Sequence, residues 1–114
     1  MAHGDLTYYW LSTADAEKAK GFYGELLGWR FSPGSAPEGW NIEETTPHGG
    51  LHGGNAEMKA NLCFEVDDLE AAMEKVRALG GEAEEPQPTE AGQFSLCRDD
   101  QGYEFCIWAA DARD

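Results

Sequence analysis

The chain carries one sequence pattern twice, and this duplication limits its fold more than any other feature. The first copy begins with an aromatic and apolar run over residues 6–11, passes through Asp15 and ends at Gly28. The second begins at residues 59–64, passes through Asp68 and ends at Gly80. Each copy predicts a strand, a helix cap, a helix and a glycine stop. We therefore expect two half-domains that pack together, with a ligand most naturally held where they face each other.

Both predicted helices have apolar residues at helical spacing, which indicates one apolar face on each. The cap of the second helix is Asp67 or Asp68, and the cap of the first is Asp15. In the first helix this face consists of Ala19, Phe22, Tyr23, Leu26 and Leu27. In the second helix the predicted buried stripe consists of Leu69, Ala72, Met73, Val76 and Leu79.

Short runs of alternating or apolar residues predict the remaining strands. In the first half they lie at residues 29–31 and 40–43, with a turn over residues 33–39 and a short glycine-rich strand after Pro47. In the second half they lie at residues 94–97 and 104–109, preceded by an edge strand and loop over residues 82–91. The order is β-α-β-β-β, twice. The predicted class is α+β: two four-stranded sheets, each backed by a helix, that join into a curved mixed sheet around a cavity.

Length indicates a single domain, residues 1–114, built from modules 5–54 and 59–110. The formal net charge is −14, with 22 acidic against 8 basic residues, which argues against nucleic acid or an anionic membrane as a partner. The same charge would steer a cationic or neutral ligand towards the protein, although acidity also serves solubility alone. No segment is apolar enough to span a bilayer, and we expect no signal peptide.

The three cysteines all lie in strand-like segments: Cys63, Cys97 and Cys106. Their odd number and apolar surroundings predict buried free thiols in a reducing cytoplasm, without a disulfide framework. Cys63 and Cys106 lie on strands expected to pair, so a reactive pair is an alternative to inert thiols.

The ordered set of motifs resembles the vicinal oxygen chelate superfamily, which includes glyoxalases, bleomycin-resistance proteins and extradiol dioxygenases. The resemblance covers nearly the whole chain, and one position departs from it: Asp100 stands where the family usually has proline. The resemblance implies a duplicated βαβββ fold and usually a homodimer, but it does not fix function. The residues that carry it are Asp15, Ala19, Phe22-Tyr23, Leu27-Gly28-Trp29, Gly49-Gly50-Leu51, Val66-Asp67-Asp68, Leu79-Gly80-Gly81, Gly92, Phe94 and residues 99–105.

Metal-dependent relatives place ligands on the first and last strand of each half. By resemblance these positions are Tyr8, Asn61, Cys106 and a position in the glycine segment near residues 51–53. Such donors do not make a typical divalent site, which needs imidazole and carboxylate. We therefore expect no cofactor. A divalent metal is the less favoured alternative, with His48 and His52 as its candidate ligands.

Strand alternation predicts that the cavity is lined by aromatic and polar side chains, which suit a flat, amphipathic or cationic small molecule. We therefore expect a metal-free small-molecule-binding protein of the glyoxalase and bleomycin-resistance type, which sequesters an aromatic or cationic ligand. A lyase, isomerase or dioxygenase with an unusual metal site or a carboxylate base, Glu65 or Glu104, is one alternative. A protein-interaction module is another, since aromatic residues also fill interfaces. The predicted lining residues are Tyr8, Trp10, Trp40, Asn61, Cys63, Cys106 and Trp108, with Glu65 and Glu104 on the same faces.

Overall fold

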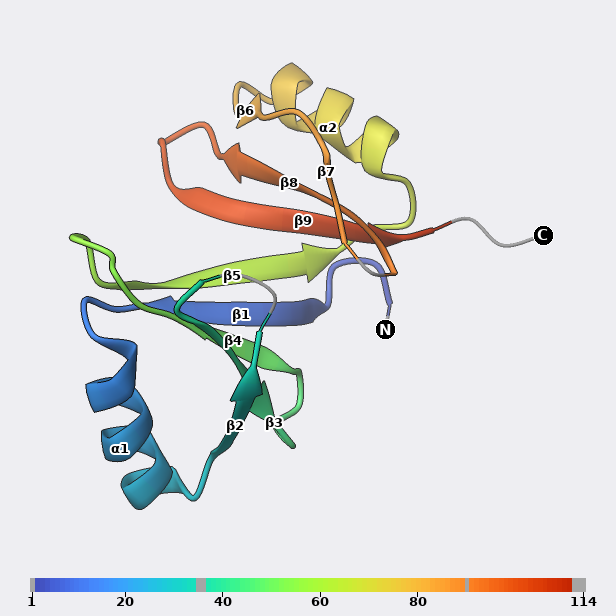
Figure 1. The fold of residues 1–114 in the computed structure, drawn as a ribbon. Helices are drawn as coiled ribbons and strands as arrows, with labels where there is room; N and C mark the ends of the chain where they lie inside the picture. The colour runs from blue at the N-terminus through green and yellow to red at the C-terminus, as the bar shows by residue number, and fades with distance from the viewer. Residues whose placement is uncertain (1, 35–36, 90, 112–114) are drawn as a thin grey trace. The chain divides into compact units, whose positions relative to one another are not determined.

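The structure is a computed structural model that describes residues 2–34, 37–89 and 91–111. Its elements follow the order β-α-β-β-β in each half of the chain, as the duplication predicts (Figure 1). The chain divides into two compact units: Tyr8–Asn61, and Met1–Thr7 together with Leu62–Asp114. Two of the strands, β1 (Leu6–Ser12) and β5 (Lys59–Glu65), cross the boundary between the units.

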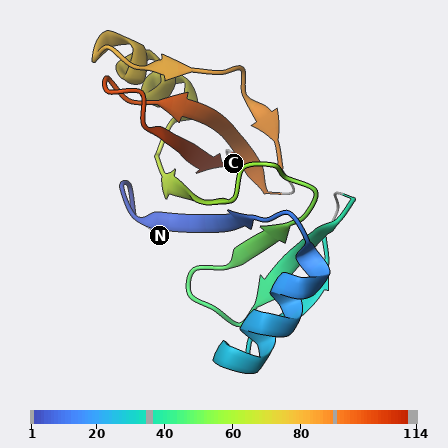
Figure 2. The same ribbon diagram turned by 90° about the vertical axis from the view of Figure 1, so that its left-hand side faces the viewer.

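The first unit has strands in the order β2-β3-β4-β1. Strand β1 pairs with β4 in parallel, whereas β2–β3 and β3–β4 are antiparallel. The helix α1 packs on one face of these strands (Figure 2), where Ala16 joins Ile42 and Leu51 in a buried cluster. The bounds are α1 Ala16–Leu27, β2 Arg30–Pro33, β3 Gly39–Glu43 and β4 Gly49–His52.

Helix α1 begins and ends where the sequence predicts. The Asp15 carboxylate accepts a hydrogen bond from the backbone N–H of Lys18 at 3.1 Å, and Gly28 ends the helix with φ 71°, a left-handed conformation that favours glycine. The apolar residues of α1 are less buried than their spacing suggests. Phe22 and Leu26 are 63% and 64% exposed, so they contribute little to the core.

The second unit has strands in the order β5-β9-β8-β6, and a two-residue strand, β7, also pairs with β8. Strands β5 and β9 are parallel, whereas β8 pairs with β9 and with β6 antiparallel. The helix α2 packs against this sheet through a cluster that includes Leu69, Met73 and Ile107. The bounds are α2 Leu69–Ala78, β6 Glu82–Ala83, β7 Gln87–Pro88, β8 Gly92–Arg98 and β9 Glu104–Ala110.

Asp68, rather than Asp67, caps α2, because its carboxylate accepts a hydrogen bond from the Ala71 N–H at 3.1 Å. Leu79 was expected in the buried stripe of this helix, and that prediction is wrong. The helix stops at Ala78, so Leu79 is the C-terminal cap and its side chain is 67% exposed.

The predicted α+β class is confirmed, since each unit combines one helix with a sheet that has parallel and antiparallel pairs. The segment over residues 82–91, expected to be an edge strand and a loop, contains two strands of two residues each. Ser35 and Ala36, in the predicted turn after Pro33, lie outside the described residues. Within those residues, no helix is long and apolar enough to cross a membrane.

Candidate functional site

In the first unit, strand alternation separates the helix side of the sheet from an opposite face. The helix side carries Leu51 and Ile42, which contact the α1 cluster. Trp10 therefore lies on the opposite face, because its neighbour Leu11 packs with that cluster. Its cross-strand partner on β4 is Gly50. Tyr8 shares this face with Trp10, two residues away on the same strand.

Tyr8 and Trp10 form an aromatic pair above Gly50, which has no side chain. Their ring centroids are 6.0 Å apart with an interplanar angle of 31°. A Cβ added at Gly50 would collide with the Tyr8 hydroxyl oxygen, so the glycine is what lets the phenol lie over β4. Burial raises the pKa of Tyr8, with a smaller contribution from Tyr9. At neutral pH Tyr8 is thus an uncharged phenol that can donate or accept a hydrogen bond.

Asn61 lies near this pair, as the resemblance implies, but its amide is already engaged. Its Nδ2 donates to the Trp10 carbonyl at 3.2 Å and to the Ser12 Oγ at 3.1 Å. These bonds fix the end of the first unit to β1. The amide nitrogen of Asn61 therefore orients the strand that carries the aromatic pair.

The two candidate histidines have different surroundings. His52 pairs with Ser12 across β4 and β1 and is half-buried, whereas His48 is exposed and precedes β4. Burial lowers the pKa of His52, so its imidazole is neutral at pH 7. A neutral imidazole on this face can hydrogen-bond to a ligand without adding charge.

Trp40 does not share a face with Tyr8 and Trp10. It packs against the cluster beneath α1, and the Lys20 ammonium lies 3.1 Å from its ring centroid. Lys20 also pairs with Glu17 at 3.1 Å, on the same helix. Alternation explains the position, because Trp40 and the buried Ile42 are two residues apart on β3. Its indole already has a cation as its partner.

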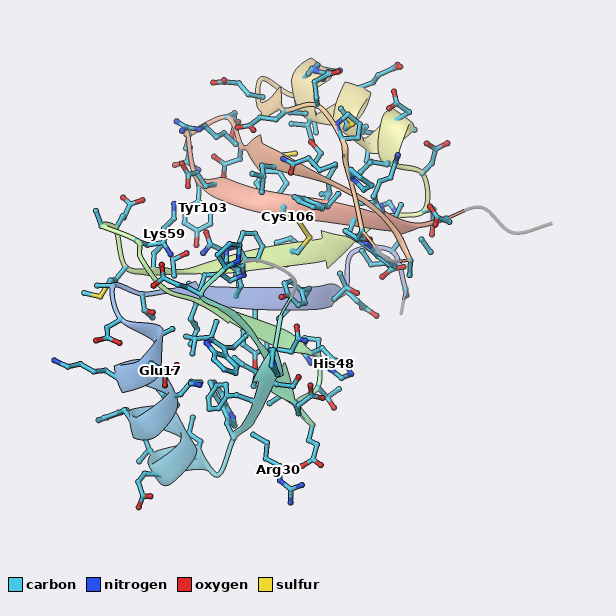
Figure 3. All side chains as sticks on the ribbon, in the orientation of Figure 1. Glu17, Arg30, His48, Lys59, Tyr103 and Cys106 are labelled. Carbon is cyan, nitrogen blue, oxygen red and sulfur yellow. A yellow bond between two sulfur atoms is a disulfide. The ribbon has the colours of Figure 1, made fainter. Side chains whose placement is uncertain are left out.

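In the second unit, Cys63 and Cys106 form a disulfide, whereas Cys97 is free and buried. The prediction of free thiols is therefore wrong for two of the three cysteines. The reason is their register: Cys63 and Cys106 are direct partners on the parallel strands β5 and β9, with Cα atoms 4.2 Å apart. Both are almost fully buried, and Cys106 lies on the side of β9 away from α2 (Figure 3). The expected cytoplasmic location loses the support that free thiols gave it.

Trp108 continues the face that carries this disulfide. Its register partners are Glu65 on β5 and Phe94 on β8. The indole Nε1 donates to the Thr89 Oγ1 at 3.1 Å, which holds the ring in place. An aromatic surface with one neighbouring carboxylate lies here, as predicted from alternation.

The two carboxylates considered as general bases differ in their partners. Glu104 accepts a hydrogen bond from the Arg98 guanidinium at 3.0 Å, in a half-exposed ion pair across β8 and β9. Glu65 is half-buried, and its backbone bonds to the N-terminal segment through Gly4 and Asp5. A base role for Glu104 would first require loss of its ion pair.

The donors at the positions of the relatives' metal ligands do not fit a divalent metal. Tyr8 is a half-buried neutral phenol, the Asn61 amide is hydrogen-bonded to β1, and the Cys106 sulfur is in a disulfide. The fourth position, near residues 51–53, offers one imidazole, that of His52, and a single imidazole without a carboxylate is not the donor set that such a site needs. In residues 2–34, 37–89 and 91–111, no three His, Cys, Asp or Glu side chains gather in a metal-binding group.

The sequence shows Glu43 on a predicted strand, but it did not place this carboxylate on the Tyr8 face of the first unit, where it bonds to Ser32. The Ser32 hydroxyl donates to Glu43 Oε2, and Asn41 Nδ2 donates to the Pro33 carbonyl at 3.3 Å. Glu43 lies on this face because Ile42, its neighbour, packs beneath α1. Alternation along residues 40–43 was the signal that could have placed Glu43 there.

Comparison with solved structures supports the fold. Methylmalonyl-CoA epimerase from Mycobacterium tuberculosis has a TM-score of 0.66 and 14% identity, over 96% of this chain and 89% of that chain. A hypothetical protein from Bacillus halodurans C-125 reaches 0.71 at 12% identity, over 97% of each chain. A variant of the Streptomyces coelicolor epimerase, in complex with 2-nitronate-propionyl-CoA, gives 0.66 at 11%, over 97% of this chain and 100% of that chain. At such identities the likeness establishes the fold alone.

No curated protein matches the chain at a significant level. The sequence model of the glyoxalase-like domain, in contrast, matches residues 9–108, which is most of the chain. The match spans both repeats and agrees with the paired βαβββ order of the structure. The chain therefore belongs to the glyoxalase-like domain family.

Proposed function

We propose that this protein binds an aromatic or cationic small molecule without a metal. The observation that carries the proposal is the Tyr8–Trp10 pair, which lies over Gly50 on the sheet face away from α1. An aromatic surface with a neutral phenol beside it offers stacking and one hydrogen bond, as small-molecule sites commonly do.

The charge of the protein favours a cationic ligand over an anionic one. A net charge of −14 raises the local concentration of cations, and aromatic faces attract cations further. The donors at the relatives' metal positions are each engaged or uncharged, which supports binding without a metal. The proposed activity is capture of the ligand rather than its conversion.

A thermal-shift screen tests the proposal, with flat aromatic cations, neutral aromatics and acyl-CoA esters as separate arms. A ligand present at about 100 times its dissociation constant stabilises the native state by about 2.7 kcal/mol, which a melting curve resolves. We expect the cationic aromatics to raise the melting temperature most. If no arm raises it, the binding proposal fails.

A pair of tryptophan variants locates the site. Trp10→Phe should lose most of the fluorescence quenching by a ligand from the screen. Trp40→Phe is the matched control, because Trp40 lies beneath α1 with Lys20 against its ring. Equal quenching losses in both variants would contradict binding at the Tyr8–Trp10 face.

A second candidate function is proton transfer by Glu43, as in an isomerase. It is favoured by the hydrogen-bonded Ser32–Glu43 pair, which shares the face of Tyr8 and Trp10. It also agrees with the fold of the methylmalonyl-CoA epimerases. Exchange of the α-hydrogen of a branched acyl-CoA thioester in D2O, followed by NMR, measures the activity. Glu43→Gln should abolish the exchange, and exchange that persists in this variant would exclude Glu43 as the base.

A further inference from the structure

Three neighbouring strands of the second unit carry a carboxylate and two aromatic rings at one level of the sheet. The register pairs Trp108 on β9 with Glu65 on β5 and with Phe94 on β8. Side chains at paired positions project from the same face, and neighbouring strands are about 4.8 Å apart. All three residues are half-buried, so each keeps part of its surface open to solvent.

Two contacts at its edge hold the indole ring of Trp108 in place. Its Nε1 donates a hydrogen bond to Thr89 Oγ1 at 3.1 Å. A Cβ added at Gly92 would lie 2.8 Å from Trp108 Cζ2, so the glycine lets the ring lie against β8. Because its N–H donor is already engaged, the indole offers a ligand its π face rather than a hydrogen bond. A ring that is already ordered also loses little side-chain entropy when a ligand binds.

The carboxylate of Glu65 has no basic side chain as its partner. Its backbone is hydrogen-bonded to Gly4 and Asp5. Within the part of the chain that the structure describes, however, its side chain forms no ion pair. Arg98 lies on the same face of β8, but its guanidinium pairs with Glu104 at 3.0 Å. A carboxylate beside an aromatic ring therefore favours a positive charge that comes from outside the chain.

Another tryptophan of this chain shows the same combination with the cation supplied by the chain itself. The Lys20 ammonium lies 3.1 Å from the ring centroid of Trp40 and pairs with Glu17 at 3.1 Å. An indole, an ammonium and a carboxylate thus form one cluster in the first unit. Trp108 has the indole and, in Glu65, the carboxylate, but among the described residues no Lys or Arg lies over its ring. A cationic ligand would do for Trp108 what Lys20 does for Trp40.

We propose that Trp108, Phe94 and Glu65 form a binding site for a quaternary ammonium ion. The carboxylate is the charged acceptor of this site, and its other walls are the two rings and, two residues along the strands, Leu96 and the disulfide. A primary ammonium needs acceptors for three N–H donors, which such walls do not provide. A quaternary ammonium has no N–H to satisfy, and both the aromatic faces and the carboxylate attract it. The site uses no residue of the Tyr8–Trp10 pair, so it goes beyond the function proposed above.

Titration of the 15N-labelled, oxidised protein with choline chloride, followed by NMR, tests the proposal. The chain has four tryptophans, and the indole N–H signal of Trp108 is the one that Trp108→Leu removes. Choline should shift this signal saturably, with a dissociation constant in the millimolar range. The neutral isostere 3,3-dimethyl-1-butanol has the same shape without the charge and should bind at least fivefold more weakly. Sodium chloride at matched concentration controls for ionic strength.

Two variants with a matched control assign the binding energy to these side chains. Glu65→Gln keeps the shape of the side chain and should raise the dissociation constant about fivefold, measured at the Trp108 indole signal. Trp108→Leu should raise it by a similar factor, measured at the backbone amides of β9. Glu74→Gln, the same charge change at an exposed position of α2, should leave it unchanged. The amide spectrum of each variant shows that it is folded.

Three results would overturn the proposal. The first is the lack of a saturable shift of the Trp108 signal with choline. The second is equal binding of choline and its neutral isostere, because the charge would then play no part. The third is an equal effect of Glu65→Gln and Glu74→Gln, because the attraction would then come from the net charge of the protein rather than from this site. The quenching test of the Tyr8–Trp10 pair has an independent outcome.

Discussion

Removal of the Cys63–Cys106 disulfide should lower the free energy of unfolding substantially. The two residues are separated by 43 positions in the sequence. A crosslink over a loop of this length removes denatured-state entropy worth about 4 kcal/mol at 25 °C. The crosslink also joins β5 directly to β9 within the second unit, so its loss acts on the sheet that packs against α2.

Urea denaturation followed by circular dichroism measures this effect. The oxidised wild type is compared with the same protein under reducing conditions and with Cys63→Ala/Cys106→Ala. For a urea dependence of about 2 kcal/mol per molar, a loss of about 4 kcal/mol lowers the midpoint by about 2 M. The reduced wild type and the double variant should have similar midpoints.

Cys97→Ala provides the matched control. Cys97 is buried in the α2 core and free, so its truncation should cost about 1 kcal/mol by loss of packing, with or without reductant. A thiol titration checks the bond itself: the denatured protein should give one thiol before reduction and three after it. Three thiols before reduction, or a wild-type midpoint that reductant does not move, would refute this reasoning.

Three other predictions concern charge, close packing and the helix–sheet contact. Burial lowers the pKa of His52, so the unfolded state binds a proton at this imidazole more readily than the folded state does. The free energy of unfolding should therefore fall as the pH drops below about 6.5. In melting curves, His52→Gln should flatten this pH dependence. Gly92→Ala should lower the free energy of unfolding by about 1 to 3 kcal/mol, because the added Cβ would collide with the β9 backbone. Gly21→Ala places its Cβ in open space and should raise the free energy of unfolding by about 0.5 to 1 kcal/mol. Urea titrations measure both changes. Lys20→Ala should cost about 1 kcal/mol, measured the same way, because it removes the cation over the Trp40 ring together with the methylene packing.

The duplication and the helix signals made most of the fold predictable from the sequence. Asp15 supplies a side-chain acceptor for a free backbone N–H at the start of the helix, and Gly28 tolerates the left-handed φ at its end. Both effects depend only on residues close by in the sequence. Alternation placed Tyr8, Trp10 and Trp108 on the faces away from the helices for the same reason. These features depend on neighbours in the sequence, which a sequence displays directly.

The failures concern contacts between strands and the depth of packing. Cys63 and Cys106 form a disulfide because the β5–β9 register places them directly opposite each other. The sequence of one strand alone does not determine its register with another strand. Phe22 has the spacing of a core residue, yet its side chain is 63% exposed. Trp40 was assigned to the wrong face because the phase of a five-residue strand is weakly defined without its neighbours.

Three of the positions that the resemblance assigns to metal ligands carry donors that are uncharged or already engaged, each for a different physical reason. Tyr8 is a neutral phenol whose pKa is raised by burial, two hydrogen bonds to β1 hold the Asn61 amide, and a disulfide occupies the Cys106 sulfur. Each donor also contributes to the scaffold: an aromatic pair over Gly50, a strand fixed to its neighbour, and a crosslink between β5 and β9. Introducing a chelating side chain at one position would therefore remove a structural contact and still leave the other two donors engaged. The engagement of these donors in structural contacts supports the proposed capture of a small molecule without a metal.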